Sequence, residues 1–222
     1  MRLAVLSGNL GGMADILPGS DPRVIDLAVQ ELAAGGLVAY PTDTVYGLGA
    51  AASNEGAVRK MFAAKGRPPS KAVPLLVADT MMASWVADVT PLANTLMGAF
   101  WPGPLTIVMK KLDTYHSLAL AKETTVALRV PDQSIVRSII WGLSEPITGT
   151  SANRSGARSP ISAAEVAMGM GEMISFVIDG GTVRHRTEST IIDLTQEGGP
   201  VILREGAVTR EELQRVLGKA LK

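Results

Sequence analysis

The amino-acid sequence predicts an α/β protein, a single domain in which a twisted mixed sheet is flanked by helices. Short apolar runs alternate with amphipathic segments of helical period, which is the element order of α/β layer folds. The chain of 222 residues is long enough to bury about 70% of the surface of its unfolded form. Apolar strands cluster late in the chain, and the segment WPGPLT (101–106) precedes one of them. This order favours a mixed sheet over a purely parallel one.

The first 87 residues contain three predicted helices and two predicted strands. Asp21 is a candidate N-cap, Pro22 a candidate first helical residue and Gly35 a helix stop. The apolar strand 37–40 then runs directly into PTDTVYGLGA. A helix over 54–64, a strand over 74–78 and a helix over 79–87 follow.

The rest of the chain continues the alternation. No internal repeat and no linker interrupts it, so residues 1–222 are predicted to form one domain. Strands are predicted over 105–110, 125–130, 146–150, 174–179, 189–194 and 201–204, and helices over 91–100, 132–141, 162–170 and 209–221.

The composition restricts the kinds of site that the chain can build. Lys plus Arg and Asp plus Glu each number 21, so an anion site must be a local cluster rather than a global field. The absence of cysteine and the presence of only two histidines exclude disulfides, thiolate nucleophiles and His-rich zinc sites. No apolar run approaches the ~18 residues of a membrane span, and the N-terminal apolar run is too short for a signal peptide. We therefore expect a soluble cytoplasmic protein.

The segment AAKGRPPSKAVPLL (63–76) is a stiff basic loop. Lys65, Arg67 and Lys71 fall within seven residues without an acid, and three prolines restrict the backbone. A Lys and an Arg together suit a polyphosphate, the first as a point charge and the second as a bidentate fork. A solvated surface turn is the alternative, and the residues alone leave both open.

Two more polar segments follow apolar strands. PTDTVYGLGA is rich in hydroxyls and glycines, so it is either a ligand-binding loop or an ordinary tight turn. GTSANRSG (149–156) is a near match to the hydrolase elbow, with Asn153 where a glycine is needed. It is either a set of small ligand-binding groups or an Asx-turn or helix cap.

Arg129 lies in the apolar strand TVALRVPD, where an unpaired guanidinium is costly. It has either an internal carboxylate partner or a ligand carboxylate. Ser189 and Arg204 fall near the ends of two further strands.

Eight stretches in order carry a family resemblance from about residue 21 to residue 207. They are PTDTVYGLGA, KGRP, PLLV, WPGPLT, LRVPD, TSANRSG, STIIDL and ILREG. Together they resemble the YrdC-like family of L-threonylcarbamoyladenylate synthases, in a short form without the extra C-terminal domain of longer relatives.

The resemblance implies a sheet folded around a large, positively lined cavity. It also implies an enzyme that joins L-threonine, bicarbonate and ATP into threonylcarbamoyl-AMP and releases pyrophosphate, with Mg²⁺ on the ATP phosphates. A separate transferase would move the product group to tRNA, and no membrane is involved.

The resemblance also implies roles for individual residues. Lys65 and Arg67 would act on the transferring phosphate. The ATP side would contain Arg67, Lys71, Thr125, Ser151, Asn153, Ser159 and Arg204, and the threonine side Thr42, Arg129, Gly149 and Ser189. No protein ligand to a metal is expected. Where many relatives carry a histidine after the PLIV-type strand, this chain has Ala78.

Two rival functions stay open at this level. A non-catalytic RNA-binding module of the same fold is disfavoured by the neutral net charge and by 4% aromatic residues. The related hydrogenase-maturation carbamoyltransferases are much larger and contain zinc-finger and acylphosphatase-like parts.

Overall fold

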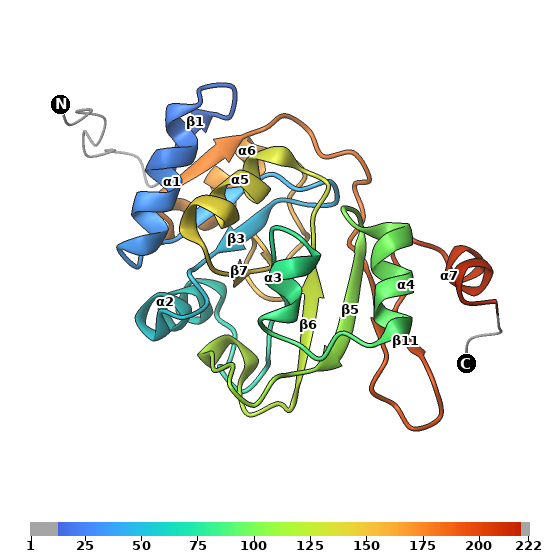
Figure 1. Ribbon diagram of the computed structural model, residues 1–222. Coiled ribbons are helices and arrows are strands. Elements are labelled where there is room, and N and C mark those ends of the chain that lie inside the picture. The colour runs from blue at the N-terminus through green and yellow to red at the C-terminus, as the bar shows by residue number, and fades with distance from the viewer. Residues whose placement is uncertain (1–12, 219–222) are drawn as a thin grey trace.

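The computed structural model describes residues 13–218, and over this range it confirms an α/β protein in which strands and helices alternate (Figure 1). The strands are β1 (Asp15–Pro18), β2 (Val38–Tyr40), β3 (Gly47–Gly49), β4 (Leu75–Leu76), β5 (Leu105–Lys110), β6 (Thr125–Arg129), β7 (Ile147–Thr148), β8 (Thr150–Ser151), β9 (Phe176–Asp179), β10 (Thr190–Asp193) and β11 (Val201–Arg204). The helices are α1 (Arg23–Ala33), α2 (Glu55–Lys65), α3 (Thr80–Ser84), α4 (Pro91–Phe100), α5 (Ser134–Leu143), α6 (Ala163–Met170) and α7 (Arg210–Leu217), with short 3-10 turns at Leu118–Leu120 and Gly171–Met173.

The strands divide between two mixed sheets. One has five strands in the order β1-β9-β2-β3-β8, and the other has six in the order β11-β10-β5-β6-β4-β7. The strand predicted over 146–150 is in fact two strands, because β7 pairs with β4 while β8 pairs with β3. Gly149 lies between them, at the point where the chain passes from one sheet to the other.

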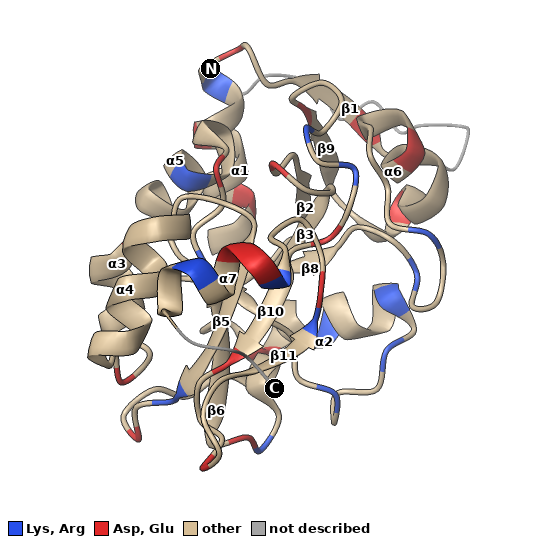
Figure 2. Ribbon diagram, turned by 90° about the vertical axis from the view of Figure 1, so that its right-hand side faces the viewer, with Lys and Arg blue, Asp and Glu red and all other residues tan. Residues whose placement is uncertain are grey.

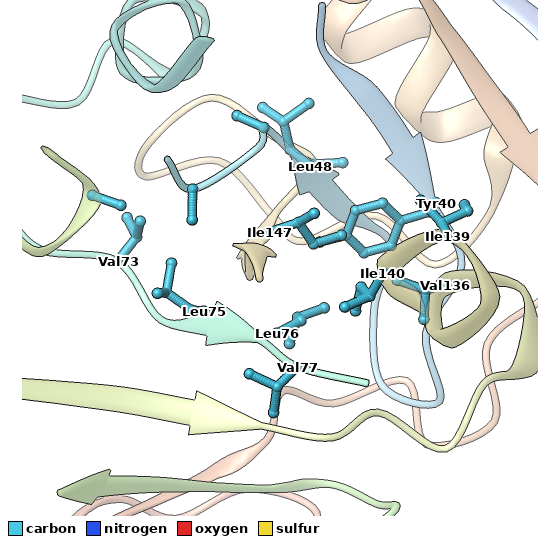
Figure 3. Packing of buried hydrophobic residues seen from close by; sticks show 14 of the residues in the cluster. Tyr40, Leu48, Val73, Leu75, Leu76, Val77, Val136, Ile139, Ile140 and Ile147 are labelled. Atoms are coloured by element: carbon cyan, nitrogen blue, oxygen red, sulfur yellow. The ribbon is translucent and has the colours of Figure 1, made fainter. Parts of the chain in front are cut away.

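The hydrophobic core lies between the two sheets and under α5 (Figure 3). Fully burying one large aliphatic side chain contributes roughly 1.5–3 kcal/mol to stability. The Tyr40 hydroxyl is also satisfied, because it donates a hydrogen bond to Thr148 O at 2.7 Å. Side chains labelled in Figure 3 come from both sheets and from α5: Tyr40, Leu48, Leu75, Leu76, Ile147, Val136, Ile139 and Ile140.

Helices cover the outer faces of the sheets. The amphipathic helix α1 packs on α5, and α4 packs on α7 (Figure 1). In α1 the buried residues Val24, Ala28 and Leu32 recur every four residues, as one face of a helix requires. Within residues 13–218, no helix is long and apolar enough to cross a membrane.

Some observed element boundaries differ from those predicted from the hydrophobic pattern. Helix α1 begins at Arg23, with Pro22 as its N-cap, while the Asp21 carboxylate accepts a hydrogen bond from Arg23 N at 3.0 Å. Helix α7 ends at Leu217, and positions 219–221 of the predicted helix lie outside the described residues. Strand β1, in the glycine-rich start of the chain, was not predicted.

Strand β3 was also missed, because its sequence is Gly-Leu-Gly and glycine is depleted in strands. Gly47 and Gly49 are needed in β3 because the Tyr40 ring packs directly on them. A Cβ at Gly47 or Gly49 would collide with that ring, which lies flat against β3. The tyrosine therefore takes the place of side chains that β3 cannot have.

Candidate functional site

A cavity of about 480 Å³ opens over one face of the six-stranded sheet. Alternate residues of a strand point to the same face, and this periodicity explains the lining. Strand β6 contributes Thr125, Ala127 and Arg129 by this alternation and Val126 outside it, and β5 contributes Thr106 and Val108. The same spacing is seen in and just before β10, at Ser189, Ile191 and Asp193. The opposite wall is formed by the loop before β3 and by the β7–β8 crossing.

The cavity brings together residues that are far apart in the sequence. Of the predicted site residues, the lining includes Arg67, Thr125, Arg129, Gly149, Ser151, Ser189 and Arg204. It does not include Thr42, Lys65, Lys71, Asn153 or Ser159. The threonine-side and ATP-side predictions therefore meet in one space, although not every predicted residue lines it.

The basic loop is partly ordered by its own arginine. Arg67 Nε donates to Lys71 O at 3.1 Å, and Arg67 Nη2 donates to Ala72 O at 2.8 Å. Lys71 is exposed, whereas Arg67 lines the cavity. Figure 2 shows Lys and Arg positions at the end of α2 and along the loop that follows it. The loop thus has one cation at the cavity and one in solvent.

Lys65 is the last residue of α2, and it is buried. Its ammonium donates to Asn153 O at 2.7 Å and to Ser151 O at 2.5 Å. Burial and, to a smaller extent, the charge of Arg67 lower the pKa of Lys65 to about 8, while Glu188 opposes the shift. In this structure Lys65 fixes the loop that contains Ser151 and Asn153, behind the cavity wall.

We expect the affinity for ATP, the ligand that the resemblance implies, to fall as the pH rises through about 8. Below that pH Lys65 is protonated and its charge attracts the phosphates, and above it the neutral amine does not. The loss should be no more than about fivefold, the upper scale of an exposed ion pair, because Lys65 lies behind the cavity wall and acts without direct contact. Calorimetric titration with ATP from about pH 7.5 to about pH 9.5 measures it. Lys65→Met has no titrating amine, so its affinity for ATP should be low and independent of pH over that range. An equal pH-dependent fall in Lys65→Met would contradict the role of the Lys65 charge in ATP binding.

The TSANRSG segment is held by internal hydrogen bonds. Ser151 Oγ donates to Asn153 Oδ1 at 2.5 Å, and Asn153 Nδ2 donates to Ala157 O at 2.7 Å. Gly149, which precedes this segment, has no room for a side chain, since a Cβ there would lie 2.9 Å from Leu76 Cδ2. Gly149 lines the cavity, and its close packing on Leu76 is by itself a sufficient reason for a glycine at this position.

Arg129 has an internal carboxylate partner, so the first of its two alternatives is confirmed. Its Nη2 forms an ion pair with Asp43, Nη1 donates to Thr44 Oγ1 at 2.8 Å and Nε donates to Gly103 O at 2.9 Å. Burial lowers the pKa of Arg129, and the Asp43 carboxylate opposes that shift. Asp43 Oδ2 is buried and has no hydrogen-bond partner. The PTDT segment therefore clamps Arg129 at the cavity.

Thr42 shapes that segment from inside. Its Oγ1 donates to Val45 O at 2.6 Å and accepts from Thr44 N at 3.1 Å. The residue that lines the cavity is Thr44, two positions later. The tight-turn alternative is confirmed, and this turn places Thr44 beside Arg129 in the cavity lining. Ligand binding by this segment stays a prediction.

Sequence reasoning missed several polar residues of the lining. Thr106 Oγ1 lies 2.8 Å from Ser189 Oγ, and period-two spacing within LTIVMK could have identified it. The carboxylates of Glu123, Glu188 and Asp193 also line the cavity, beside the three arginines. The lining consequently does not have the excess of positive charge that the resemblance implies.

Within the described residues, no group of three or more His, Asp or Glu side chains could hold a metal ion. Asp193 Oδ1 accepts from Thr195 N at 2.8 Å, and Oδ2 accepts from Gln196 Nε2 at 2.6 Å. Glu188 is engaged by Arg204 and Ser159. The donor set of this part of the chain does not form a dedicated metal cage.

Comparisons with known proteins agree with this architecture. The Sua5_yciO_yrdC family model, described as "Telomere recombination", matches residues 30–206. Threonylcarbamoyl-AMP synthase of Pyrococcus abyssi is 42% identical over 196 residues, covering 88% of this chain and 57% of that protein. The Bacillus subtilis protein of the same name is 38% identical over 208 residues, covering 93% and 60%. The chain thus spans less than two thirds of the length of these two relatives.

A solved structure extends the likeness to three dimensions. P. abyssi Sua5 complexed with L-threonine superposes with a TM-score of 0.87 at 39% identity, covering 93% of this chain and 61% of that chain.

Proposed function

Because this chain belongs to the Sua5/YciO/YrdC family, we propose that it forms threonylcarbamoyl-AMP and pyrophosphate from L-threonine, bicarbonate and ATP. The names of the P. abyssi and B. subtilis relatives support the reaction, and the threonine complex supports the amino-acid substrate. In this chain the supporting observation is the cavity, where Arg67, Arg129 and Arg204 from three separate segments line one space.

Arg129 is the proposed anchor for the threonine carboxylate. A guanidinium has five N–H donors, and three of them are matched by acceptors in the protein. The others remain for a bidentate contact to a carboxylate. Gly149, Thr44 and Ser189 line the same cavity and supply a close backbone approach and two hydroxyls.

The chemistry needs positioning and charge neutralisation rather than a covalent nucleophile. The threonine nitrogen forms a bond to the carbon of bicarbonate and water leaves, which gives a carbamate. A carbamate oxygen then attacks the α-phosphorus, and the bond to the pyrophosphate oxygen breaks. Arg67 and Arg204 at the cavity, with Lys65 behind its wall, would offset the negative charge that develops.

We propose that Mg²⁺ arrives on the phosphate oxygens of ATP, because it prefers hard oxygen ligands and keeps several waters. It would neutralise charge on the leaving pyrophosphate. We also propose that a separate transferase passes the threonylcarbamoyl group to tRNA and that the protein acts in the cytoplasm.

An omission assay tests the proposal. We expect ATP cleavage to yield pyrophosphate and to need both threonine and bicarbonate, because the carbamate is the nucleophile. Release of ADP and phosphate, or cleavage that is indifferent to threonine, would reject the reaction. RNA binding without any turnover would favour the non-catalytic RNA-binding module.

A further inference from the structure

Glu188 lies in the cavity wall, and its carboxylate is held by two residues of the proposed ATP side. Ser159 Oγ donates to Glu188 Oε1 at 2.7 Å, and Arg204 Nη1 forms an ion pair with Glu188 Oε2. Ser159 lies in the loop after β8, while Arg204 ends β11. One carboxylate therefore joins two segments that the resemblance assigns to the ATP side.

The backbone of Glu188 is fixed in place. Ala207 N donates to Glu188 O at 3.0 Å. Gly206 packs so closely on this segment that an added Cβ would collide with the carbonyl of Glu188 and with the backbone of Ser189. The carboxylate is thus presented by an ordered segment, and only its side chain has to move for the contact to break.

Glu188 also interacts electrostatically with Lys65 at the end of α2. Glu188 is the carboxylate that raises the pKa of Lys65 against the effect of burial. A carboxylate and a phosphate group both offer anionic oxygens to arginine, so they compete for the same N–H donors. The ion pair is half-exposed, with side-chain exposures of 40% for Arg204 and 37% for Glu188, so a ligand can break it.

We propose that Glu188 is an internal competitor for polyphosphate, occupying the position between Ser159 and Arg204 that a phosphate group takes in the complex. This inference rests on the proposed function for the identity of the anion. In the free protein the carboxylate screens Arg204. After the reaction it returns to Arg204 and helps to displace pyrophosphate. The residue therefore lowers the affinity for substrate and product phosphates alike.

The test compares pyrophosphate and ATP binding by calorimetry in the wild type and in Glu188→Gln. Glutamine has the same length and still accepts a hydrogen bond from Ser159, but it has no charge. We expect both ligands to bind roughly 5- to 10-fold more tightly, because a half-exposed ion pair contributes up to about fivefold and one repulsive charge is removed. The inhibition of turnover by pyrophosphate should increase by the same factor.

Two further variants separate local competition from a general field. Glu172→Gln removes an exposed carboxylate outside the cavity lining and should change pyrophosphate affinity by less than about twofold. In an Arg204→Ala background, Glu188→Gln should gain less than about twofold, because the competition through Arg204 is gone and only the removed repulsion remains.

The outcomes distinguish this inference from the proposed function. Unchanged or weaker pyrophosphate binding in Glu188→Gln overturns the role of Glu188, whatever the enzyme makes. Tighter pyrophosphate binding without any ATP binding supports the role of Glu188 and contradicts the proposed reaction. If neither ligand binds to any variant, there is no polyphosphate site and both proposals fail.

Discussion

Arg129→Ala is expected to destabilise the protein by about 3–5 kcal/mol, the usual cost of leaving one partner of a buried ion pair alone. The side chains of Arg129 and Asp43 are 7% and 1% exposed, so water cannot replace the lost partner. Asp43 Oδ2 already lacks a hydrogen-bond partner, and without Arg129 the whole carboxylate would depend on the Asp132 amide. Denaturant titration with a fluorescence or circular-dichroism readout measures the loss.

Arg129→Met combined with Asp43→Asn separates folding from binding. The double variant removes both charges, so most of the lost stability should return, since apolar or neutral replacements of a buried pair are well tolerated. Threonine binding should still be weakened by about 2–5 kcal/mol, because the carboxylate partner is missing. A single variant as stable as the wild type would contradict the buried-pair argument. Normal threonine affinity in the double variant would exclude Arg129 as the carboxylate anchor.

Arg67→Ala is expected to lower turnover by about 100- to 1,000-fold, the effect of removing a donor aimed at developing charge. Arg67 lines the cavity and closes its own loop through Lys71 O and Ala72 O. Arg67→Lys should restore only part of the rate, because a point charge cannot reproduce a bidentate fork. Steady-state kinetics, with ATP affinity measured separately, detects the change.

Arg59→Ala is the matched control for Arg67→Ala. Arg59 is an exposed cation on α2 that pairs with Glu55 in the same helix, away from the cavity lining. Its removal should leave turnover within about twofold of the wild type. A near-normal rate in a folded Arg67→Ala protein would return the basic loop to the surface-turn interpretation.

The hydrophobic pattern was enough to predict most of the elements. Helix α4 and strands β5 and β11 have the predicted bounds, because their periodicity and flanking residues agree. The division into two sheets could not be read from the pattern. It depends on a crossing at Gly149, where five apolar and small residues in a row look like one strand.

The candidate site was predictable only in part, for a related reason. Motif positions such as Arg129 and Arg204 identify segments that reach the cavity, but they do not say which side chain of a segment points inward. That is decided by hydrogen bonds within the loops. Thr42 turns inward and brings Thr44 to the cavity, and Lys65 bonds to the backbone of Ser151 and Asn153. Glu188 belongs to no motif that was singled out, and only the fold brings it to Arg204.

Mass spectrometry of the product made from ¹³C-labelled bicarbonate shows whether the chain forms threonylcarbamoyl-AMP. The purified chain is incubated with L-threonine, ATP, Mg²⁺ and labelled bicarbonate, and the nucleotide products are examined. We expect a threonylcarbamoyl adenylate that contains a single ¹³C atom, formed in equal amount with pyrophosphate. Unlabelled adenylate, or AMP or ADP formed without any threonylcarbamoyl adduct, would contradict this expectation.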